Sequence, residues 1–350
     1  MQGLMLTGRL VSGKREGANF TQLEWARHQF IRKLGIDPFP GTLNLILESP
    51  AARQNWEKLR DSPGIQIIPP TNNWCMALCY PVRVMNQIPG AIVYPILPGY
   101  SRNQVEVIAA LSIRDFFSLQ DGDQLILGVT HALKVKAVIF NVDGTLVDSL
   151  EAYRVVAQQA ARELDTLITD RTIRCALNTG QSFWEMILPE ETPDRQYWIK
   201  RFKSKAISLW PEVLRQHGRI FPGVREILKT LRARGAKLGI LSGSRVGAFQ
   251  PLEVEGLMEF FDVILTGKEV DKRKPSPEGL LKCAQMLDAP ASQCVYVGDA
   301  AIDIEASKAA GMASVAVLSG AGDSALLSAC GPDWIIYAIS QLPGVLEIGP

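Results

Sequence analysis

The chain has 350 residues, 47% of them hydrophobic and 21% charged. This composition is ordinary for a folded protein, and the length exceeds what one typical hydrophobic core supports, so we expect two domains. The 37 Lys and Arg residues nearly balance the 36 Asp and Glu residues, and the net charge of +1 excludes a generally basic binder of nucleic acid or membrane surfaces. No apolar run approaches the roughly 18 residues of a membrane-spanning helix, and the first residues do not form a secretory signal, so the expected location is cytoplasmic.

Motifs built on cysteine or histidine are not expected. Six cysteines are scattered along the chain, and only Cys75 and Cys79 are close together, without a second ligand pair or a nearby histidine. This spacing does not suit a zinc site. None of the three histidines stands beside Ser or Cys in a nucleophile motif, so histidine-based hydrolysis is not expected either.

The first third of the sequence has the pattern of a compact β domain. Short β-branched and aromatic runs, such as 91–94 and 105–108, stand between Gly, Pro and Asn residues. A glycine-spaced turn at 8–20 follows an early strand, and such turns can bring backbone N–H groups to phosphates. Further on, strand alternation places the oxygens of Thr42 and Asn44 on one side, which suits Mg²⁺ that nucleotide phosphates also hold.

This succession of motifs resembles the archaeal-type CTP-dependent riboflavin kinase family, whose members are small β-barrel enzymes that phosphorylate riboflavin to FMN. The resemblance covers residues about 5–128. It rests on Pro-Gly-Thr-Leu-Asn-Leu at 40–45, Glu-Val-Ile-Ala at 106–109 and Asp-Gly-Asp at 121–123. The resemblance implies a β-barrel over residues 1–133.

The same resemblance implies where the ligands of this domain would bind. CTP would be the phosphate donor, Thr42 and Asn44 would bind Mg²⁺, and Glu106 would lie at the flavin. The residues implied to contact the nucleotide are Gly13, Lys14, Arg15, Glu16, Gly17, Ala18, Leu111, Ser112, Ile113 and Arg114.

Two positions depart from this family's pattern. Arg15 stands in the glycine-rich turn where the family usually has glycine, and Pro98 stands where a flavin-contacting threonine is usual, eight residues before Glu106. The side chain of Arg15 would either crowd the nucleotide or add a contact to its phosphates. The alternative for this domain is therefore a barrel that serves for binding or for scaffolding its neighbour.

From about residue 134 the pattern becomes that of a parallel α/β sheet, because apolar strands alternate with helical stretches. Residues about 149–220 interrupt the alternation with helical patterning and predict an inserted helical subdomain. The five expected strands lie at 137–140, 238–241, 263–265, 294–297 and 314–317.

Polar side chains follow these expected strands, at the edge of an open α/β sheet where ligands gather. Carboxylates, a hydroxyl and an ammonium at neighbouring strand ends are what Mg²⁺-assisted phosphoryl transfer requires. The alternative is that they are helix caps and turn residues of an ordinary α/β protein. The residues of this set are Asn141, Asp143, Ser242, Lys274, Asp299 and Asp303.

In order and spacing these motifs resemble the haloacid dehalogenase superfamily, specifically its phosphoglycolate-phosphatase-like members, which carry a helical cap inserted after the first motif. The resemblance covers residues about 136–340 and includes the Phe-Pro-Gly-Val sequence at 221–224. It implies a Rossmann-like α/β domain over residues 134–350, with the cap at about 149–220.

Carried over by position, the resemblance gives each residue of the set a role. Asp143 would be the general acid/base and would bind Mg²⁺ through its backbone carbonyl. Ser242 and Lys274 would hold the phosphoryl oxygens. Asp299 and Asp303 would complete the metal site.

The main departure is Asn141, at the position of the family's nucleophilic aspartate, which is also a metal ligand. An amide cannot supply the attacking anion and binds Mg²⁺ more weakly than a carboxylate does, so we expect this site to bind its ligand but hardly turn it over. Two origins are open: an aspartate replaced to trap a phosphorylated ligand, or a natural chain that has lost hydrolysis and kept the pocket. The intact remaining motifs favour replacement, or binding retained under constraint.

Within the expected cap, the turn at 178–182 and the following Phe183 and Trp184 are the expected lid segment facing the phosphate site. The alternative interpretation is a helix break with aromatic side chains in the cap's own core.

Two hypotheses of function follow. The first is a bifunctional protein of flavin metabolism, in which a Mg²⁺-dependent phosphomonoester phosphatase is fused to a CTP-dependent riboflavin kinase-like domain. Its phosphatase substrate would be FMN or another riboflavin-pathway or small phosphate, and Asn141 would disable hydrolysis. The second is a catalytically inactive flavin- or nucleotide-binding regulator or scaffold. The expected partners are a phosphomonoester and a flavin, with no nucleic acid and no membrane.

Overall fold

The computed structural model describes residues 4–13, 20–71, 73–162, 168–188, 190–243 and 249–349. Tertiary contacts divide the chain into two compact units. One unit contains residues 1–131 and 324–337, and the other contains residues 132–323 and 338–350. In the part of the chain that is described, no helix is long and apolar enough to cross a membrane.

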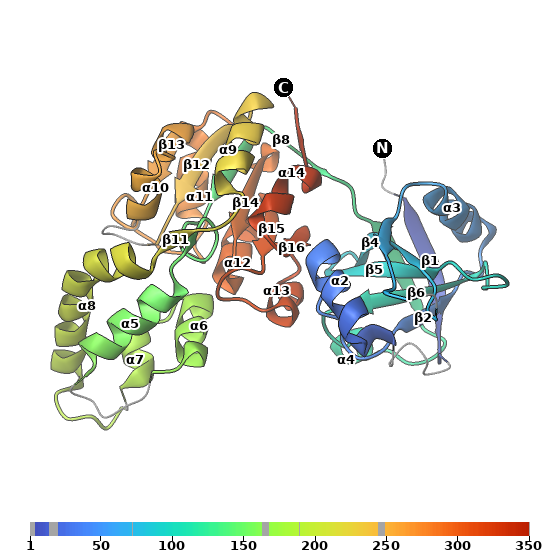
Figure 1. Ribbon diagram of the computed structural model, residues 1–350, viewed down its shortest axis with the longest axis horizontal. Coiled ribbons are helices and arrows are strands. Elements are labelled where there is room, and N and C mark those ends of the chain that lie inside the picture. The colour runs from blue at the N-terminus through green and yellow to red at the C-terminus, as the bar shows by residue number, and fades with distance from the viewer. Residues whose placement is uncertain are drawn as a thin grey trace. The chain divides into compact units, whose positions relative to one another are not determined.

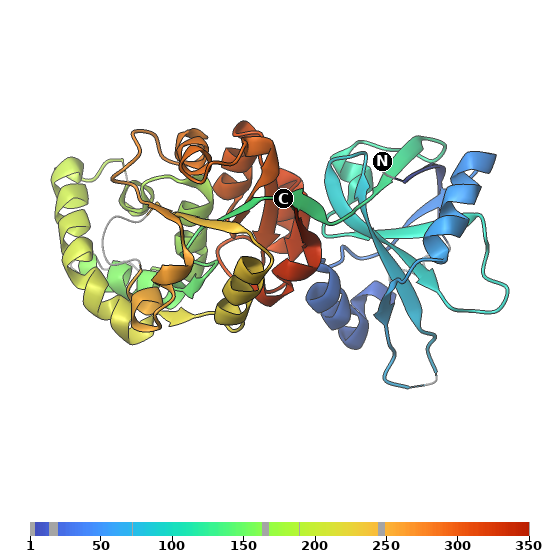
Figure 2. The ribbon, with the colours of Figure 1, turned by 90° about the horizontal axis from the view of Figure 1, so that it is seen from above.

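The first unit is built on a closed antiparallel barrel. Hydrogen bonds join six strands in the order β4-β5-β6-β2-β1-β7, β7 pairs back to β4, and β3 adds to the outer side of β4. Closure leaves the barrel itself without free edges. The predicted β-barrel is confirmed (Figure 2). The strands are β1 (Met5–Val11), β2 (Leu43–Ile46), β3 (Ile65–Ile67), β4 (Ala77–Val84), β5 (Ile88–Pro95), β6 (Gln104–Ala109) and β7 (Gln124–Val129).

Alternate side chains of the strands fill the barrel. In β1, Leu6 and Leu10 are fully buried while Thr7 between them is exposed, as the two-residue period of a strand requires. Helix α3 (Pro50–Arg60) adds the buried Trp56 to this core, and α2 (Glu24–Leu34) packs Phe30 into a second apolar cluster. The remaining elements of the unit are α4 (Ile113–Phe116), α13 (Ser324–Cys330) and β16 (Trp334–Ile336).

The second unit contains the predicted parallel sheet. Its strands pair in the order β13-β12-β9-β14-β15, and each of these pairs is parallel. Parallel strands bring their carboxyl ends to the same edge, so the loops that follow them converge there. All five strands predicted from the sequence are present: β9 (Ala137–Phe140), β12 (Lys237–Leu241), β13 (Val263–Leu265), β14 (Cys294–Gly298) and β15 (Ala313–Val317).

Helices connect these strands and cover the sheet. Side chains of α11 and α12 join Ile139 and Tyr296 of the sheet in one buried cluster. Helix α9 turns Val224, Ile227 and Leu231 inward, which is the spacing of a one-sided helix. A short parallel pair of strands, β8 and β17, lies in the same unit. The bounds of these elements are α9 (Val224–Ala233), α10 (Gln250–Val254), α11 (Glu278–Met286), α12 (Ala301–Ala309), α14 (Leu342–Val345), β8 (Leu133–Val135) and β17 (Leu346–Ile348).

The predicted helical cap is also confirmed. The chain enters it through β10 (Val147–Asp148) and leaves it through β11 (Arg219–Ile220), which pair with each other. Between them the described residues form four helices, which gather in one cluster (Figure 1). The cap has its own core, in which the rings of Trp184 and Trp198 pack against Phe202. The helices are α5 (Leu150–Ala160), α6 (Asp170–Thr179), α7 (Phe183–Ile187) and α8 (Arg195–His217).

The cap core predicts a measurable loss of stability on truncation. Phe202 is fully buried, so Phe202→Ala is expected to lower the free energy of unfolding by about 3–5 kcal/mol, because apolar contacts are lost and a cavity remains. Thermal denaturation followed by circular dichroism measures the effect. Tyr197→Ala is the matched control, since Tyr197 lies on the same helix and is 56% exposed; equal effects of the two changes would contradict the assignment of Phe202 to a core.

Candidate functional sites

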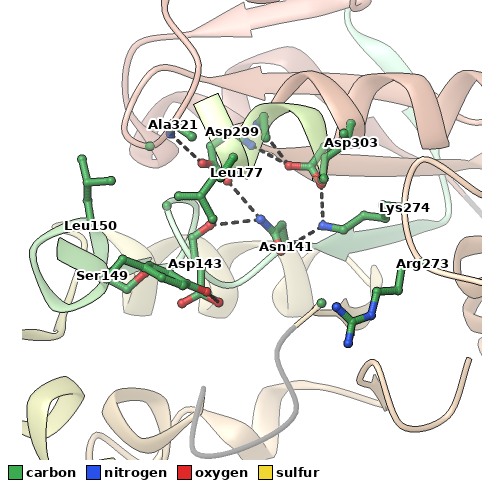
Figure 3. Close-up of a pocket in the computed structure, with 18 of the residues that line it drawn as sticks. Asn141, Asp143, Ser149, Leu150, Leu177, Arg273, Lys274, Asp299, Asp303 and Ala321 are labelled. Carbon is green, nitrogen blue, oxygen red and sulfur yellow. Dashed lines mark hydrogen bonds and ion pairs between the residues drawn. The ribbon is translucent and has the colours of Figure 1, made fainter. Parts of the chain in front are cut away.

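Asn141 lies at the centre of the polar residues of the second unit, directly after β9, and is 8% exposed. Its Nδ2 donates to Asp299 Oδ1 and to the backbone oxygen of Asp143, both at 3.0 Å. Its Oδ1 accepts from Lys274 Nζ at 3.2 Å (Figure 3). Since an ammonium group can only donate, Lys274 fixes the amide with its oxygen toward the lysine and its NH₂ toward the carboxylate.

Asp299, after β14, is a buried carboxylate of the site. Thr145 Oγ1 donates to its Oδ1 at 3.0 Å and the N–H of Ala321 to its Oδ2 at 2.8 Å. Burial, and then the neighbouring charge of Asp303, raise the pKa of Asp299 to about 6, although its hydrogen bonds act in the opposite direction. A Cβ at Gly144, where φ is +74°, would collide with this carboxylate, so the loop after β9 needs glycine there.

Asp303 and Lys274 form a buried ion pair. Lys274 Nζ lies 2.5 Å from Asp303 Oδ1 and donates to the Tyr296 hydroxyl at 2.9 Å. The other carboxylate oxygen of Asp303 accepts the N–H groups of Asp299 and Ala300, both at 3.1 Å, at the start of α12. Burial and the nearby carboxylates raise the pKa of Tyr296 well above its ordinary value, so this hydroxyl stays neutral. Both oxygens of Asp303 therefore hold its protein neighbours in place.

A cavity of about 230 Å³ opens beside these groups. Five of the six polar residues predicted from the sequence line it: Asn141, Asp143, Lys274, Asp299 and Asp303. Asp143 Oδ2 accepts the hydroxyl of Tyr153 of the cap at 3.3 Å. Ser242, the sixth, is buried and lines a smaller neighbouring cavity of about 20 Å³, while Gly243 beside it lines the larger one.

The cap is hydrogen-bonded to the loops that carry the site. Asn178 Oδ1 accepts the N–H of Ala301, and its Nδ2 donates to Ala321 O, both at 3.0 Å. Arg174 of the same helix donates to the carbonyl of Gly320. Of the segment predicted as a lid, Gly180 and Gln181 line the cavity. Trp184 belongs to the cap core. One part of the segment therefore faces the phosphate-site cavity, as expected of a lid, and another part packs in the cap's own core.

The polar residues predicted in the barrel also lie together. Thr42 Oγ1 donates to Glu106 Oε2 at 2.9 Å. Asn44 lies on the same side of β2 and donates to Thr42 O at 3.2 Å, while its oxygen accepts from Gln104 at 2.9 Å. Tyr100 donates to Glu106 Oε1 at 2.6 Å. Glu106 is thus held from two sides, although the usual threonine is replaced by Pro98.

The barrel unit has a cavity of about 150 Å³. It is lined by residues 39–43, which include Thr42, by residues 111–114 and by Val107 and Ala109 of β6. It therefore brings together four of the predicted nucleotide contacts, Leu111, Ser112, Ile113 and Arg114. Gly13 lies against Asn44, because a Cβ there would collide with the Asn44 amide. The predicted contacts Lys14, Arg15, Glu16, Gly17 and Ala18 lie outside the described residues.

Several residues of these sites were missed in the sequence. Tyr100, Tyr153 and Tyr296 contact predicted site residues through their hydroxyls, and no motif distinguishes them from core aromatics. Thr145 stands inside the first motif, two residues after Asp143. Its position there is the one signal that could have identified it.

The residues of the second unit can be tested for their fit to Mg²⁺. Asp299 Oδ1 and the backbone oxygen of Asp143 both face residue 141, and hard oxygen ligands of this kind suit Mg²⁺. The NH₂ group of Asn141, however, is directed at the same two oxygens. To offer its own oxygen, the amide would have to turn its NH₂ toward the Lys274 ammonium. With Asn141 the site therefore fits Mg²⁺ poorly, and among the residues described no three or more His, Cys, Asp or Glu side chains form a metal-holding group.

In the barrel the donor set does fit. Thr42 and Glu106 bring hydroxyl and carboxylate oxygens together, and Mg²⁺ shared with nucleotide phosphates needs only one or two protein ligands of this type. Asn44 directs its NH₂ at Thr42 and its oxygen at Gln104, so its oxygen would bind Mg²⁺ in place of the Gln104 bond.

Each of the two units matches a family model of known proteins. Residues 138–317 match the family model for haloacid dehalogenase-like hydrolases. Residues 10–129 match the model for the CTP-dependent riboflavin kinase domain, which is described as a domain of unknown function, DUF120.

Individual relatives match the second unit. The phosphoglycolate phosphatase of Chromobacterium violaceum is 30% identical over 222 residues, which cover 61% of this chain and 98% of that protein. The phosphoglycolate phosphatase of Neisseria meningitidis is 31% identical over 218 residues, covering 59% of this chain and 92% of that protein. A crystal structure from Bacteroides fragilis, described as haloacid dehalogenase-like, has a TM-score of 0.52 at 26% identity and covers 59% of this chain and 99% of that one.

The chain belongs to the haloacid dehalogenase-like hydrolase family. Its second unit is a capped, phosphatase-type hydrolase domain, and a riboflavin-kinase-type barrel precedes it. Both resemblances found in the sequence are confirmed.

The contact between cap and sheet leads to a second prediction. Asn178→Ala removes two hydrogen bonds to Ala301 and Ala321 and leaves backbone groups without their partners, at a cost of about 1–3 kcal/mol. Amide hydrogen exchange of α6 and of the loop at 319–322 is therefore expected to accelerate at least fivefold. Thr179→Ala, a neighbouring change that removes a local bond to Cys175 O, is the control; similar exchange in both variants would argue against the contact.

Proposed function

We propose that the second unit binds phosphomonoesters in the cavity beside Asn141, that Asn141 prevents their hydrolysis, and that an aspartate at this position makes the unit a phosphatase. The observation that carries this proposal is the convergence of Lys274, Asp143 and Asp299 on residue 141 at the edge of the sheet. The relatives named phosphoglycolate phosphatase support the reaction class.

The geometry gives each group a chemical task in the form with aspartate at position 141. The carboxylate would face Lys274, whose charge favours the ionised nucleophile and would also hold a phosphoryl oxygen. Its oxygen would attack phosphorus while the bond from phosphorus to the alcohol oxygen breaks. Asp143 would give its proton to the departing oxygen and then take one from the water that hydrolyses the aspartyl phosphate. Mg²⁺, when bound, would neutralise charge on the transferring group.

Asp303 and Ser242 have supporting tasks in this proposal. Asp303 would position Lys274, because its oxygens are engaged by that ammonium and by backbone N–H groups. The backbone beside Ser242, at Gly243, would reach the phosphate, since Gly243 lines the larger cavity.

In the first unit we propose that the barrel binds riboflavin and CTP with Mg²⁺ at Thr42 and Asn44, and transfers phosphate to the flavin. Glu106 would accept the flavin hydroxyl's proton or orient that hydroxyl, since Thr42 and Tyr100 fix its carboxylate. The substrate of the second unit would then be FMN, a related riboflavin-pathway phosphate or a small phosphate such as phosphoglycolate.

The second candidate function is an inactive flavin- or nucleotide-binding regulator or scaffold. The observation that favours it is the set of partners around the Asn141 amide, whose oxygen accepts one hydrogen bond and whose NH₂ donates two. Replacing Asn141 by aspartate distinguishes the phosphatase from the inactive regulator or scaffold.

The test of the phosphatase proposal is phosphate release. With Mg²⁺, Asn141→Asp is expected to hydrolyse at least one of FMN, phosphoglycolate and a panel of sugar phosphates at least 100-fold faster than the unchanged chain. Asn141→Ala is the control, because it removes the amide without supplying a nucleophile. Inertness of Asn141→Asp toward every substrate, with ligand binding intact, would favour the regulator.

The barrel proposal has its own test. Asn44→Ala is expected to weaken binding of Mg²⁺–CTP at least tenfold in calorimetry, because a ligand oxygen is lost. Gln87→Ala, a change of an exposed residue in the turn between β4 and β5, is the control. Unchanged affinity of Asn44→Ala for Mg²⁺–CTP would support the scaffold interpretation of the barrel.

A further inference from the structure

The cap contains a second, larger cavity of about 480 Å³. Most of its walls are apolar or aromatic, with Tyr and Trp side chains contributed by three helices. Its polar or charged lining groups, among the residues described, are limited to Tyr153, Gln181, Trp184, Trp210, Lys268 and Arg273. The apolar lining residues are Val156, Ala157, Ile173, Ala176, Leu177, Phe183, Ala206 and Ile207.

This cap cavity adjoins the cavity beside Asn141, because several residues line both. Tyr153, Leu177 and Arg273 line both cavities, together with Gln181 and Gly243. Figure 3 shows Leu177 beside the polar residues and Arg273 at their edge. A ligand whose phosphate lies near Lys274 can therefore extend its alcohol portion into the cap cavity.

The chemistry of the two cavities differs in a way that selects a ligand. A cavity of this size and lining is typical of sites for drug-sized apolar groups. A carboxylate, such as that of a two-carbon acid, would lose its hydration among Val156, Ile173 and Trp184 without gaining a partner there. It could pair with Arg273 at the boundary but would leave most of the volume unfilled.

The aromatic walls favour a flat group in particular. The rings of Tyr153 and Trp210 lie 4.5 Å apart between centroids, and Phe183 and Trp184 lie 4.9 Å apart. Trp184 and Trp210 are themselves largely buried, so they form fixed surfaces against which an aromatic ring can pack with little loss of side-chain freedom.

We infer that the second unit recognises phosphomonoesters whose alcohol portion carries an aromatic ring system, which the cap cavity holds, in preference to small acidic phosphates. This rests on the proposed function of the same site, because the phosphate is taken to bind beside Asn141. The flavin ring of FMN belongs to this class, and the cavity lining discriminates by size and apolarity.

A bulky substitution in the wall of the cap cavity tests this inference. Ala206 lines the cap cavity but not the polar cavity, so Ala206→Trp introduces an indole where the ring of the ligand would lie. Ser204→Trp is the matched control, because Ser204 is exposed on the same helix and does not line either cavity. The probes are 1-naphthyl phosphate, phosphoglycolate and inorganic phosphate, measured by calorimetry with the full chain. Naphthyl phosphate is neither a flavin nor a nucleotide, which avoids the barrel's proposed ligands.

The unchanged chain is expected to bind naphthyl phosphate at least tenfold more tightly than phosphoglycolate. Ala206→Trp should weaken naphthyl phosphate at least tenfold and change inorganic phosphate by less than twofold, while Ser204→Trp should change neither. If Ala206→Trp fails to fold, Ile207→Ala replaces it, since Ile207 lines the cavity and is 58% exposed; a severalfold weaker affinity for naphthyl phosphate alone is then expected.

Three results would overturn the inference, and they differ in what they say of the phosphate site. Equal or tighter binding of phosphoglycolate, or equal effects of the cavity variants on all three probes, would reject the aromatic substrate class and leave the phosphate site standing. Absence of binding by every probe, including inorganic phosphate, would reject the proposed function itself and this inference with it.

Discussion

The polar site of the second unit depends on the side chain of Asn141, which hydrogen-bonds both to a cationic donor and to acceptor oxygens. The Asn141 amide accepts from the Lys274 ammonium and donates to Asp299 and to the backbone oxygen of Asp143. An aspartate there would face the Asp299 carboxylate without the N–H group that now donates to it, and buried like charges are costly unless a cation compensates them. The asparagine thus makes the centre stable on its own, whereas the aspartate would make it depend on a cation.

The Asp299 carboxylate links the Asn141 site to the cap. Asp299 accepts the N–H of Ala321, and the carbonyl of Ala321 accepts from Asn178 of α6. The position of helix α6 is therefore coupled, through Ala321, to a buried acid of the site. Tyr153 adds a second connection, since it donates to Asp143 and also lines the cap cavity. An aromatic ligand in the cap would contact the same tyrosine that orients the proposed general acid.

The sequence predicted the architecture because its signals are local. The five apolar strands, the compact β domain and the helical insertion each follow from the spacing of apolar residues and turn residues within short windows. The closure of the β domain into a barrel came from the family resemblance. Convergence of five polar residues on one cavity followed from a general rule, that loops after parallel strands meet at one edge. The orientation of the Asn141 amide could not be predicted, because it depends on Lys274, which is 133 residues away. The roles of Tyr100 and Asn178 depend equally on tertiary contacts. Ser242 faces a smaller cavity, because the direction of a side chain after a strand is set by the loop's own backbone.

In our proposal, the Asn141 amide takes the place of a divalent cation that an aspartate at this position would need. Titration of Mg²⁺ into the barrel variant Asn44→Ala, with and without the further change Asn141→Asp, isolates the site of the second unit by calorimetry. We expect no Mg²⁺ binding below millimolar concentration with Asn141, and at least tenfold tighter binding once Asn141→Asp is added. Equal Mg²⁺ affinity of the two proteins at this site would contradict the proposal.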